Sequence, residues 1–245
     1  MTKMLNGIDI ASWQGDIDLG AIADLDFVIV KATESTSYTN PFCDPKIQEA
    51  KSLGLKYGFY HFAGTYDPIA EADFFIRECE GYFGEGIPVL DFEADAINAW
   101  GSDGARMFLQ RVYEVKGVRP LIYMSQSVIE ELDWGAVAQD FGLWVASYPD
   151  VYRPDFSYDG DLGASIDPWD FMAIWQYASD GDIEGYEGNI DVNHAYMDYE
   201  AWDKYAGNVR ENGQPANVQE TGQVDNVPSV TVFEDEKHKI TIEEK

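Results

Sequence analysis

Strand-like apolar runs recur along most of the chain. They predict eight strands, at residues 7–12, 27–33, 57–64, 87–93, 120–125, 143–148, 172–179 and 190–196. Helical patterns separate several of these runs and predict helices at residues 44–53, 68–82 and 102–116. Pro45 and Pro68 stand where a first helical turn tolerates proline, and Gly54 and Gly117 stand where glycines end helices.

The alternation of strands and helices predicts parallel strand pairing with right-handed crossovers. Eight strands suggest a (β/α) barrel, and the irregular later connections indicate fewer helices than strands. We therefore expect an α/β protein with an irregular barrel that resembles a TIM barrel. Active sites on such barrels lie at the C-terminal ends of the strands.

The composition changes after Gly207, where aromatic residues become rare and Asn, Gln, Gly, Glu and Val dominate. We expect the barrel to occupy residues 1–206, followed by a linker at 207–230 and a tail at 231–245. The tail mixes β-forming residues with charges. It could form one short hairpin or begin a second, truncated domain.

The net charge of the chain is −29, from 45 acidic and 16 basic residues. Binding to a nucleic acid backbone depends on Lys and Arg, so this function class is excluded. No segment is expected to span or insert into a membrane, and no signal peptide is recognised, which suggests synthesis in a cytoplasm. The only two cysteines, Cys43 and Cys79, are expected to be buried thiols rather than a structural disulfide.

Two carboxylates end the fourth predicted strand, where Asp91 and Glu93 flank Phe92 after an apolar run. Side chains two residues apart on a strand point to the same face. Two acids on one face raise the pKa of one of them, which provides a protonated and an ionised group for glycosidic bond cleavage. The alternative is an ordinary strand end at which the acids cap a helix or meet solvent.

Two further acids interrupt apolar strands. Asp9 lies between isoleucines in the first predicted strand, and Asp191 has a similar place in the last. A lone charge at such a position is costly unless it has partners or a chemical role. The first and last strands are neighbours in a closed barrel, so we expect Asp9 and Asp191 to approach Asp91 and Glu93 at its mouth.

Aromatic side chains at or near strand ends are expected to surround these acids and to stack on sugar rings. The candidates are Tyr60, Tyr123, Tyr148, Trp175 and Tyr177. For each of them the alternative is that the ring simply fills the barrel. Lys31 could reach a carboxylate or be structural, and His61 and His194 are expected to be hydrogen-bonded scaffold residues.

Six motifs occur in the order GIDIASWQG (7–15), VIVKATE (28–34), GFYHF (58–62), LDFE (90–93), WQY (175–177) and IDVN (190–193). Together they resemble glycoside hydrolase family 25, the lysozymes (N-acetylmuramidases) of phage endolysins, bacterial autolysins and some fungi. The resemblance covers residues 7–206. It implies cleavage of the β-1,4 bond from N-acetylmuramic acid to N-acetylglucosamine in peptidoglycan. It places the family's acids at Asp9, Asp91, Glu93 and Asp191, with Glu93 as the proton donor.

The resemblance also suggests retention of anomeric configuration, with no cofactor or metal. Either Asp91 attacks the sugar as a covalent nucleophile, or the substrate's N-acetyl group attacks while Asp91 and Asp191 orient it. The two-residue spacing of Asp91 and Glu93 favours the second route. Carboxyl groups roughly 5–5.5 Å apart would fit direct attack, whereas roughly 6.5–9.5 Å would fit an inverting pair.

Three other functions remain open at this stage. A hydrolase could use a hard cation held by Asp91, Glu93, Asp95 and Asp191. The chain could be a non-catalytic peptidoglycan-binding module, or a chitinase-like N-acetylglucosaminidase. As an endolysin, it would act as a monomer on peptidoglycan glycan strands, reaching the wall from the host cytoplasm through a membrane pore, and the tail could lead into a wall-binding domain.

Overall fold

The computed structural model describes residues 4–208, 231–234 and 240–243. Eight strands form a closed barrel: β1 (Leu5–Ile10), β2 (Phe27–Glu34), β4 (Lys56–Phe62), β5 (Ile87–Asp91), β6 (Leu121–Ser125), β7 (Leu143–Ala146), β8 (Ile174–Gly181) and β9 (Ile190–Ala195). Each overlaps a predicted strand, and pairing of β1 with β2 closes the barrel. A short ninth strand, β3 (Tyr38–Thr39), extends the sheet from the end of β2.

The strand directions differ from the prediction at one place. Parallel pairing runs from β1 through β2, β4, β5, β6 and β7 to β8, but β9 is antiparallel to both β8 and β1. Only residues 182–189 connect β8 to β9, and a connection this short allows a hairpin but not a helical crossover. The prediction of uniformly parallel pairing is therefore wrong for the last strand.

Three longer helices confirm the predicted ones: α1 (Cys43–Leu53), α2 (Pro68–Glu78) and α3 (Asp95–Lys116). Helix α3 begins earlier than predicted and is kinked at Gly101, whose backbone φ of 56° breaks the helical pattern there. The remaining helices are short: α4 (Gln126–Glu131), α5 (Gly135–Ala138) and α6 (Tyr199–Tyr205), with 3-10 turns η1 (Ser12–Gln14) and η2 (Leu19–Ala21). The expected irregular α/β barrel with fewer helices than strands is confirmed.

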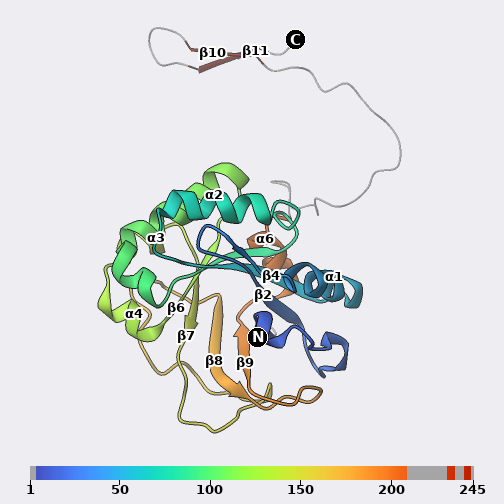
Figure 1. The fold of residues 1–245 in the computed structure, drawn as a ribbon. Coiled ribbons are helices and arrows are strands. Elements are labelled where there is room, and N and C mark those ends of the chain that lie inside the picture. The colour runs from blue at the N-terminus through green and yellow to red at the C-terminus, as the bar shows by residue number, and fades with distance from the viewer. Residues whose placement is uncertain (1–3, 209–230, 235–239, 244–245) are drawn as a thin grey trace.

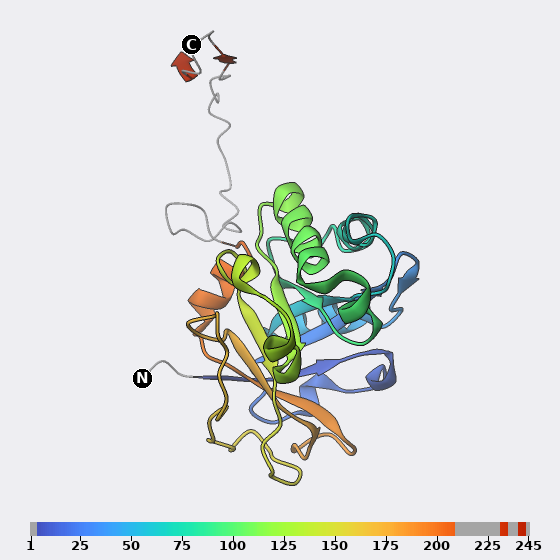
Figure 2. The ribbon, with the colours of Figure 1, turned by 90° about the vertical axis from the view of Figure 1, so that its left-hand side faces the viewer.

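The helices cover the barrel unevenly. In Figure 1, α2 and α3 lie side by side on one side of the barrel, and the two helices are in contact. The long connection between β7 and β8 (yellow in Figure 2) lies beside the β8–β9 hairpin, away from those helices. A hydrogen bond from Asp182 N to Pro154 O (3.1 Å) joins the two segments.

Alternating side chains divide the core into two regions. One contains Ile8 and Val28 with Phe75 and Phe108 from the helices, so it lies between the strands and the helical layer. The other contains Ile29 and buried side chains from opposite strands, so it fills the barrel. Trp202 of α6 packs on Phe27 with ring centroids 4.7 Å apart, closing the end of the barrel at which the parallel strands begin.

Cys43 and Cys79 are buried free thiols, as expected. Among the described residues, no helix is long and apolar enough to cross a membrane. In the predicted tail, β10 (Thr231–Glu234) pairs antiparallel with β11 (Ile240–Glu243). The predicted linker lies almost entirely outside the described residues.

Candidate active site

A polar pocket of about 270 Å³ lies at the barrel end where the parallel strands finish. Its lining comes from every one of the eight strands of the barrel. The lining residues are Asp9, Lys31, Tyr60, Phe62, Asp91, Glu93, Tyr123, Trp144, Tyr148, Gln176 and Asp191. This is the end at which barrels of this kind carry their active sites.

The four acids predicted from the sequence all line this pocket. Asp9 and Asp191 are direct partners in the β1–β9 ladder, which places them on adjacent strands. Asp91 is the last residue of β5, whereas Glu93 lies just beyond the strand. A hydrogen bond from Phe92 N to Tyr123 O (2.9 Å) continues the strand pairing past Asp91, so Glu93 stays close to the same rim.

Asp9 is held by two amide side chains that the sequence analysis did not identify. Gln176 Nε2 and Asn193 Nδ2 each donate to Asp9 Oδ2 at 2.8 Å. Trp144 Nε1 in turn donates to Asn193 Oδ1 at 2.9 Å, which fixes the orientation of the Asn193 amide. Both donors use one oxygen of Asp9, so any proton on Asp9 is directed to Oδ1.

Gln176 also connects Asp9 to two of the predicted tyrosines. Its Oε1 accepts from the Tyr123 hydroxyl at 2.9 Å and from the Tyr148 hydroxyl at 2.6 Å. A polar residue inside an apolar strand is the same signal that singled out Asp9, and it was present at Gln176 and Asn193. These two amides are the main functional candidates that sequence reasoning missed.

Burial raises the pKa of every acid in the cluster. The pKa of Asp9 rises to about 6, because desolvation outweighs the hydrogen bonds from Asn193 and Gln176. The pKa of Asp191 rises to about 8, through desolvation and then repulsion from Asp9 and Glu93. These carboxyl groups interact, so protons are shared across the cluster near neutral pH.

The pKa of Asp91 lies well above its usual range because of burial and then repulsion from Glu93 and Asp9. Its Oδ1 is buried and accepts no hydrogen bond within the described residues, so little stabilises its charge. Burial also raises the pKa of Glu93, and Lys31 opposes this rise. Lys31 itself pairs with Glu34, with Nζ 2.6 Å from Oε2.

The predicted aromatic residues divide into two groups. Tyr60, Tyr123 and Tyr148 line the pocket, and Tyr148 is 52% exposed. Trp175 and Tyr177 do not reach it, because they belong to the core outside the barrel and are fully buried. The expectation that these two rings face inward is wrong: Gln176, between them, occupies the inward face of β8.

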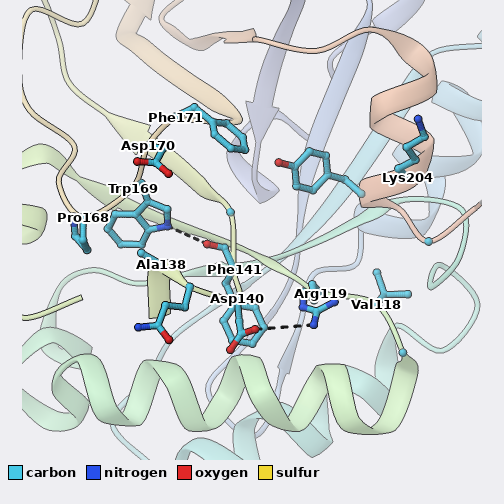
Figure 3. Close-up of a pocket in the computed structure, with 15 residues that line it drawn as sticks. Val118, Arg119, Ala138, Asp140, Phe141, Pro168, Trp169, Asp170, Phe171 and Lys204 are labelled. Atoms are coloured by element: carbon cyan, nitrogen blue, oxygen red, sulfur yellow. Dashed lines mark hydrogen bonds and ion pairs between the residues drawn. The ribbon is translucent and has the colours of Figure 1, made fainter. Parts of the chain in front are cut away.

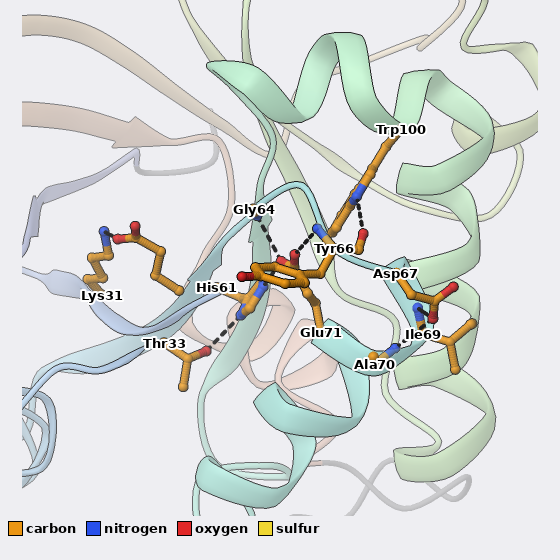
Figure 4. A network of polar contacts seen from close by, with 11 residues as sticks. Lys31, Thr33, His61, Gly64, Tyr66, Asp67, Ile69, Ala70, Glu71 and Trp100 are labelled. Atoms are coloured by element: carbon orange, nitrogen blue, oxygen red, sulfur yellow. Dashed lines mark hydrogen bonds and ion pairs between the residues drawn. The ribbon is translucent and has the colours of Figure 1, made fainter. Parts of the chain in front are cut away.

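A buried polar network supports the neighbouring segments (Figure 4). Glu71 accepts from His61 Nε2 at 2.9 Å and from the backbone N–H groups of Gly64 (2.7 Å) and Tyr66 (3.0 Å). Trp100 Nε1 donates to Tyr66 O at 2.7 Å, joining this loop to α3. The network thereby connects β4, which carries Tyr60, to the helix that follows Glu93.

The histidines in this region have structural roles, as expected. The carboxylate of Glu71 accepts a hydrogen bond from His61 Nε2–H. In the neutral ring Nδ1 is then an acceptor, so Thr33 Oγ1 donates to His61 Nδ1 at 2.8 Å. Burial lowers the pKa of His61 and keeps the ring neutral. His194 Nε2 donates to the carbonyl oxygen of Tyr158 at 2.8 Å.

A larger cavity of about 490 Å³ lies at the opposite end of the barrel (Figure 3). It is formed where β6, β7 and β8 begin and where α6 follows β9. Its acids are Asp140, which pairs with Arg119 at 3.9 Å, and Asp170. This cavity lacks the converging carboxylates of the smaller pocket, so the smaller pocket is the candidate active site.

Comparison with known proteins agrees with this geometry. The family described as "Glycosyl hydrolases family 25" matches residues 8–186. The chain belongs to this family. It is therefore a glycoside hydrolase. Three of the four pocket acids lie within the matched residues, and Asp191 lies just beyond them.

Relatives of this family 25 chain include the N,O-diacetylmuramidase of Chalaropsis sp, 32% identical over 76% of this chain and 96% of that protein. The autolytic lysozyme of Clostridium acetobutylicum is 29% identical over 77% of this chain but only 55% of its own length. Among solved structures, the lysozyme of Streptomyces coelicolor superposes with a TM-score of 0.70 at 24% identity, over 85% of this chain and 99% of that one. The last comparison shows a common fold.

Proposed function

We propose that this family 25 glycoside hydrolase is a lysozyme that cleaves the β-1,4 bond from N-acetylmuramic acid to N-acetylglucosamine in peptidoglycan. The observation that carries the proposal is the convergence of Asp9, Asp91, Glu93 and Asp191 in one pocket with raised pKa values. Relatives named muramidase and lysozyme support the same substrate.

In this proposal Glu93 is the general acid and then the general base. Burial raises the pKa of Glu93, which favours the protonated form that donates to the leaving glycosidic oxygen. After that proton has left, the Glu93 carboxylate activates the attacking water. The product retains its anomeric configuration, because two successive displacements at the sugar carbon restore the original stereochemistry.

Asp91 stabilises the positive charge that develops on the sugar. Its own charge is poorly stabilised by the protein, because the group is buried and Oδ1 lacks a hydrogen-bond donor within the described residues. A cationic transition state supplies the missing stabilisation at the moment of reaction. The two-residue spacing of Asp91 and Glu93 places both groups close together at one rim of the barrel, which supports attack by the substrate's own N-acetyl group.

Asp9 and Asp191 organise the site rather than react. Asp9 is fixed by Gln176 and Asn193, and Asp191 lies beside it on β9. Tyr60, Tyr123 and Tyr148 provide ring faces and hydroxyl groups for the sugar. No cofactor or metal takes part in this mechanism.

The proposal extends to the whole chain. Residues 1–206 would be the catalytic barrel, 207–230 a linker, and 231–245 the beginning of a wall-binding domain. The protein would act as a monomer on glycan strands at the bacterial cell wall, after synthesis in a phage-infected cytoplasm. Resemblance of the fold to the catalytic domain of a Listeria phage endolysin supports this view.

The variant Glu93→Gln tests the catalytic assignment. Glutamine is close to isosteric but cannot donate the proton, so the rate of lysis of purified cell walls should fall by about 10² to 10⁴. Glu130→Gln makes the same change at an exposed position on α4 and should retain full activity. Near-normal lysis by Glu93→Gln, with an unchanged unfolding temperature, would remove Glu93 from the acid role.

A further inference from the structure

A second groove, of about 320 Å³, lies beyond the Asp9–Asp191 pair. One wall comes from η1 and the residues that follow it, and the other from the β8–β9 turn. The lining residues are Trp13, Gln14, Asp16, Ile17, Asp18, Gly185, Tyr186 and Glu187. The chain therefore builds this groove from the segment that leaves β1 and the segment that enters β9.

The groove adjoins the candidate active site. Trp13 lies four residues after Asp9, and Glu187 lies four residues before Asp191. Four residues span at most about 14 Å, and Asp9 and Asp191 are themselves paired across the two strands. A polymer bound across the acids at this end of the barrel would therefore continue over the groove.

Trp13 is the most exposed large hydrophobic side chain of the described residues, at 91%. Its backbone is nevertheless held in place. Gln14 Oε1 accepts from Ala11 N at 3.0 Å, and Gln14 N donates to Ala11 O at 3.2 Å. Behind this turn, buried Ile17 accepts a hydrogen bond from Lys46 Nζ. The indole is thus presented to solvent by a fixed turn.

The opposite wall is also fixed. Ala23 N donates to Glu184 O at 3.2 Å, joining the β8–β9 turn to the segment after η2. At Gly185, φ is +101° and a Cβ atom would come within 2.0 Å of Ala21 O. Only glycine allows this approach, so the two walls are preformed and need no rearrangement to receive a ligand.

The chemistry of the lining restricts the ligand. Asp16, Asp18 and Glu187 line the groove, and none of the described residues that line it is basic. An anionic muramic acid ring would meet like charges there. A neutral N-acetylglucosamine ring offers an apolar face to the indole, and its hydroxyl and amide groups can donate to the carboxylates.

We propose that this groove binds an N-acetylglucosamine ring of the glycan strand, stacked on Trp13, beyond the sugars that occupy the acidic pocket. The proposal rests on the proposed lysozyme function and adds a binding position to it. In this proposal Trp13 increases the affinity for long glycan strands, and the acids of the pocket alone catalyse cleavage of the bond. Trp13 would therefore affect KM more than kcat.

The test compares Trp13→Ala and Trp13→Phe with the unmodified chain on two substrates. These are long glycan strands freed of stem peptides and the shortest peptidoglycan oligosaccharide that the enzyme cleaves. Trp13→Ala should raise KM on long strands about tenfold, equivalent to about 1.4 kcal/mol, with kcat unchanged. On the short substrate it should behave like the unmodified chain, and Trp13→Phe should recover most of the affinity for long strands.

Phe171→Ala is the matched control, because Phe171 is 65% exposed and lies at the other end of the barrel (Figure 3). It should leave KM unchanged on both substrates. An unchanged KM for Trp13→Ala on long strands, or an equal loss on both substrates, would overturn the proposed groove. If the unmodified chain cleaves neither substrate, the lysozyme function itself fails.

Discussion

Replacing Asp9 with asparagine would remove a buried charge while keeping the shape of the side chain. The new amide oxygen can still accept from Gln176 and Asn193, which both donate to Oδ2 of Asp9. Burial raises the pKa of Asp9 from an ordinary value near 3.8 to about 6 in the folded protein. Ionising Asp9 is therefore harder in the folded chain than in the unfolded chain.

The sign and size of the effect follow from this difference. Below about pH 3 Asp9 is neutral in both states and costs nothing. As the pH rises from about 3 to about 6, the unfolded chain loses its proton first, so the free energy of unfolding decreases. A rise in pKa from 3.8 to about 6 corresponds to about 3 kcal/mol, which is fully lost above pH 6.

The Asp9→Asn variant should therefore be more stable than the unmodified chain at pH 8, by up to about 3 kcal/mol. For a domain of this size that is a rise in Tm of roughly 6–12 °C. At pH 3 the two proteins should unfold at the same temperature. Thermal unfolding followed by circular dichroism at pH 3, 6 and 8 measures the difference, with Asp150→Asn as an exposed control. No gain at pH 8, or an equal gain at pH 3, would refute the reasoning.

Three further changes test the surroundings of the site. Gln176→Leu removes a donor to Asp9 and the acceptor of two tyrosine hydroxyls, so kcat/KM should fall roughly ten- to hundredfold. The acid limb of its pH profile should move to higher pH, because the Gln176 hydrogen bond lowers the pKa of Asp9. An unchanged pH profile would count against a positioning role. Glu71→Gln leaves at least one of three buried donors without an acceptor and should lower the free energy of unfolding by about 1–3 kcal/mol in urea titrations. A chain ending at Asn208 should cleave soluble fragments as fast as the full chain, and loss of that activity would place the tail in the catalytic domain. On intact Gram-positive cells, both should lyse faster at 0.1 M than at 0.01 M salt, since the Debye length falls from about 30 to about 10 Å and screens repulsion between anionic wall and anionic barrel.

The barrel and its four acids could be predicted because they depend on local patterns. Apolar runs mark the strands, and an acid inside such a run is costly enough to stand out, as at Asp9 and Asp191. Closure of the barrel then places the first and last strands together whatever the direction of the last one. The positions of the acids therefore did not depend on the strand direction that was wrongly predicted.

The facing of residues on β8 could not be predicted in the same way. A strand buried on both sides is apolar on both faces, so the apolar character of Trp175 and Tyr177 does not indicate which face of β8 points into the barrel. The polar residue between them, Gln176, marks the inward face, because its side chain donates to Asp9. The part of α3 before Gly101 was not predicted, because the kink at this residue interrupts the helical periodicity of the sequence.

The central claim is that the acidic pocket cleaves the glycan at N-acetylmuramic acid. Mass spectrometry of the fragments released from purified, chemically reduced peptidoglycan tests it directly, because it identifies the sugar at each new reducing end. We predict N-acetylmuramic acid at every new end, and release by Glu93→Gln that is slower by about 10² to 10⁴. New ends carrying N-acetylglucosamine would contradict the claim and indicate a chitinase-like specificity.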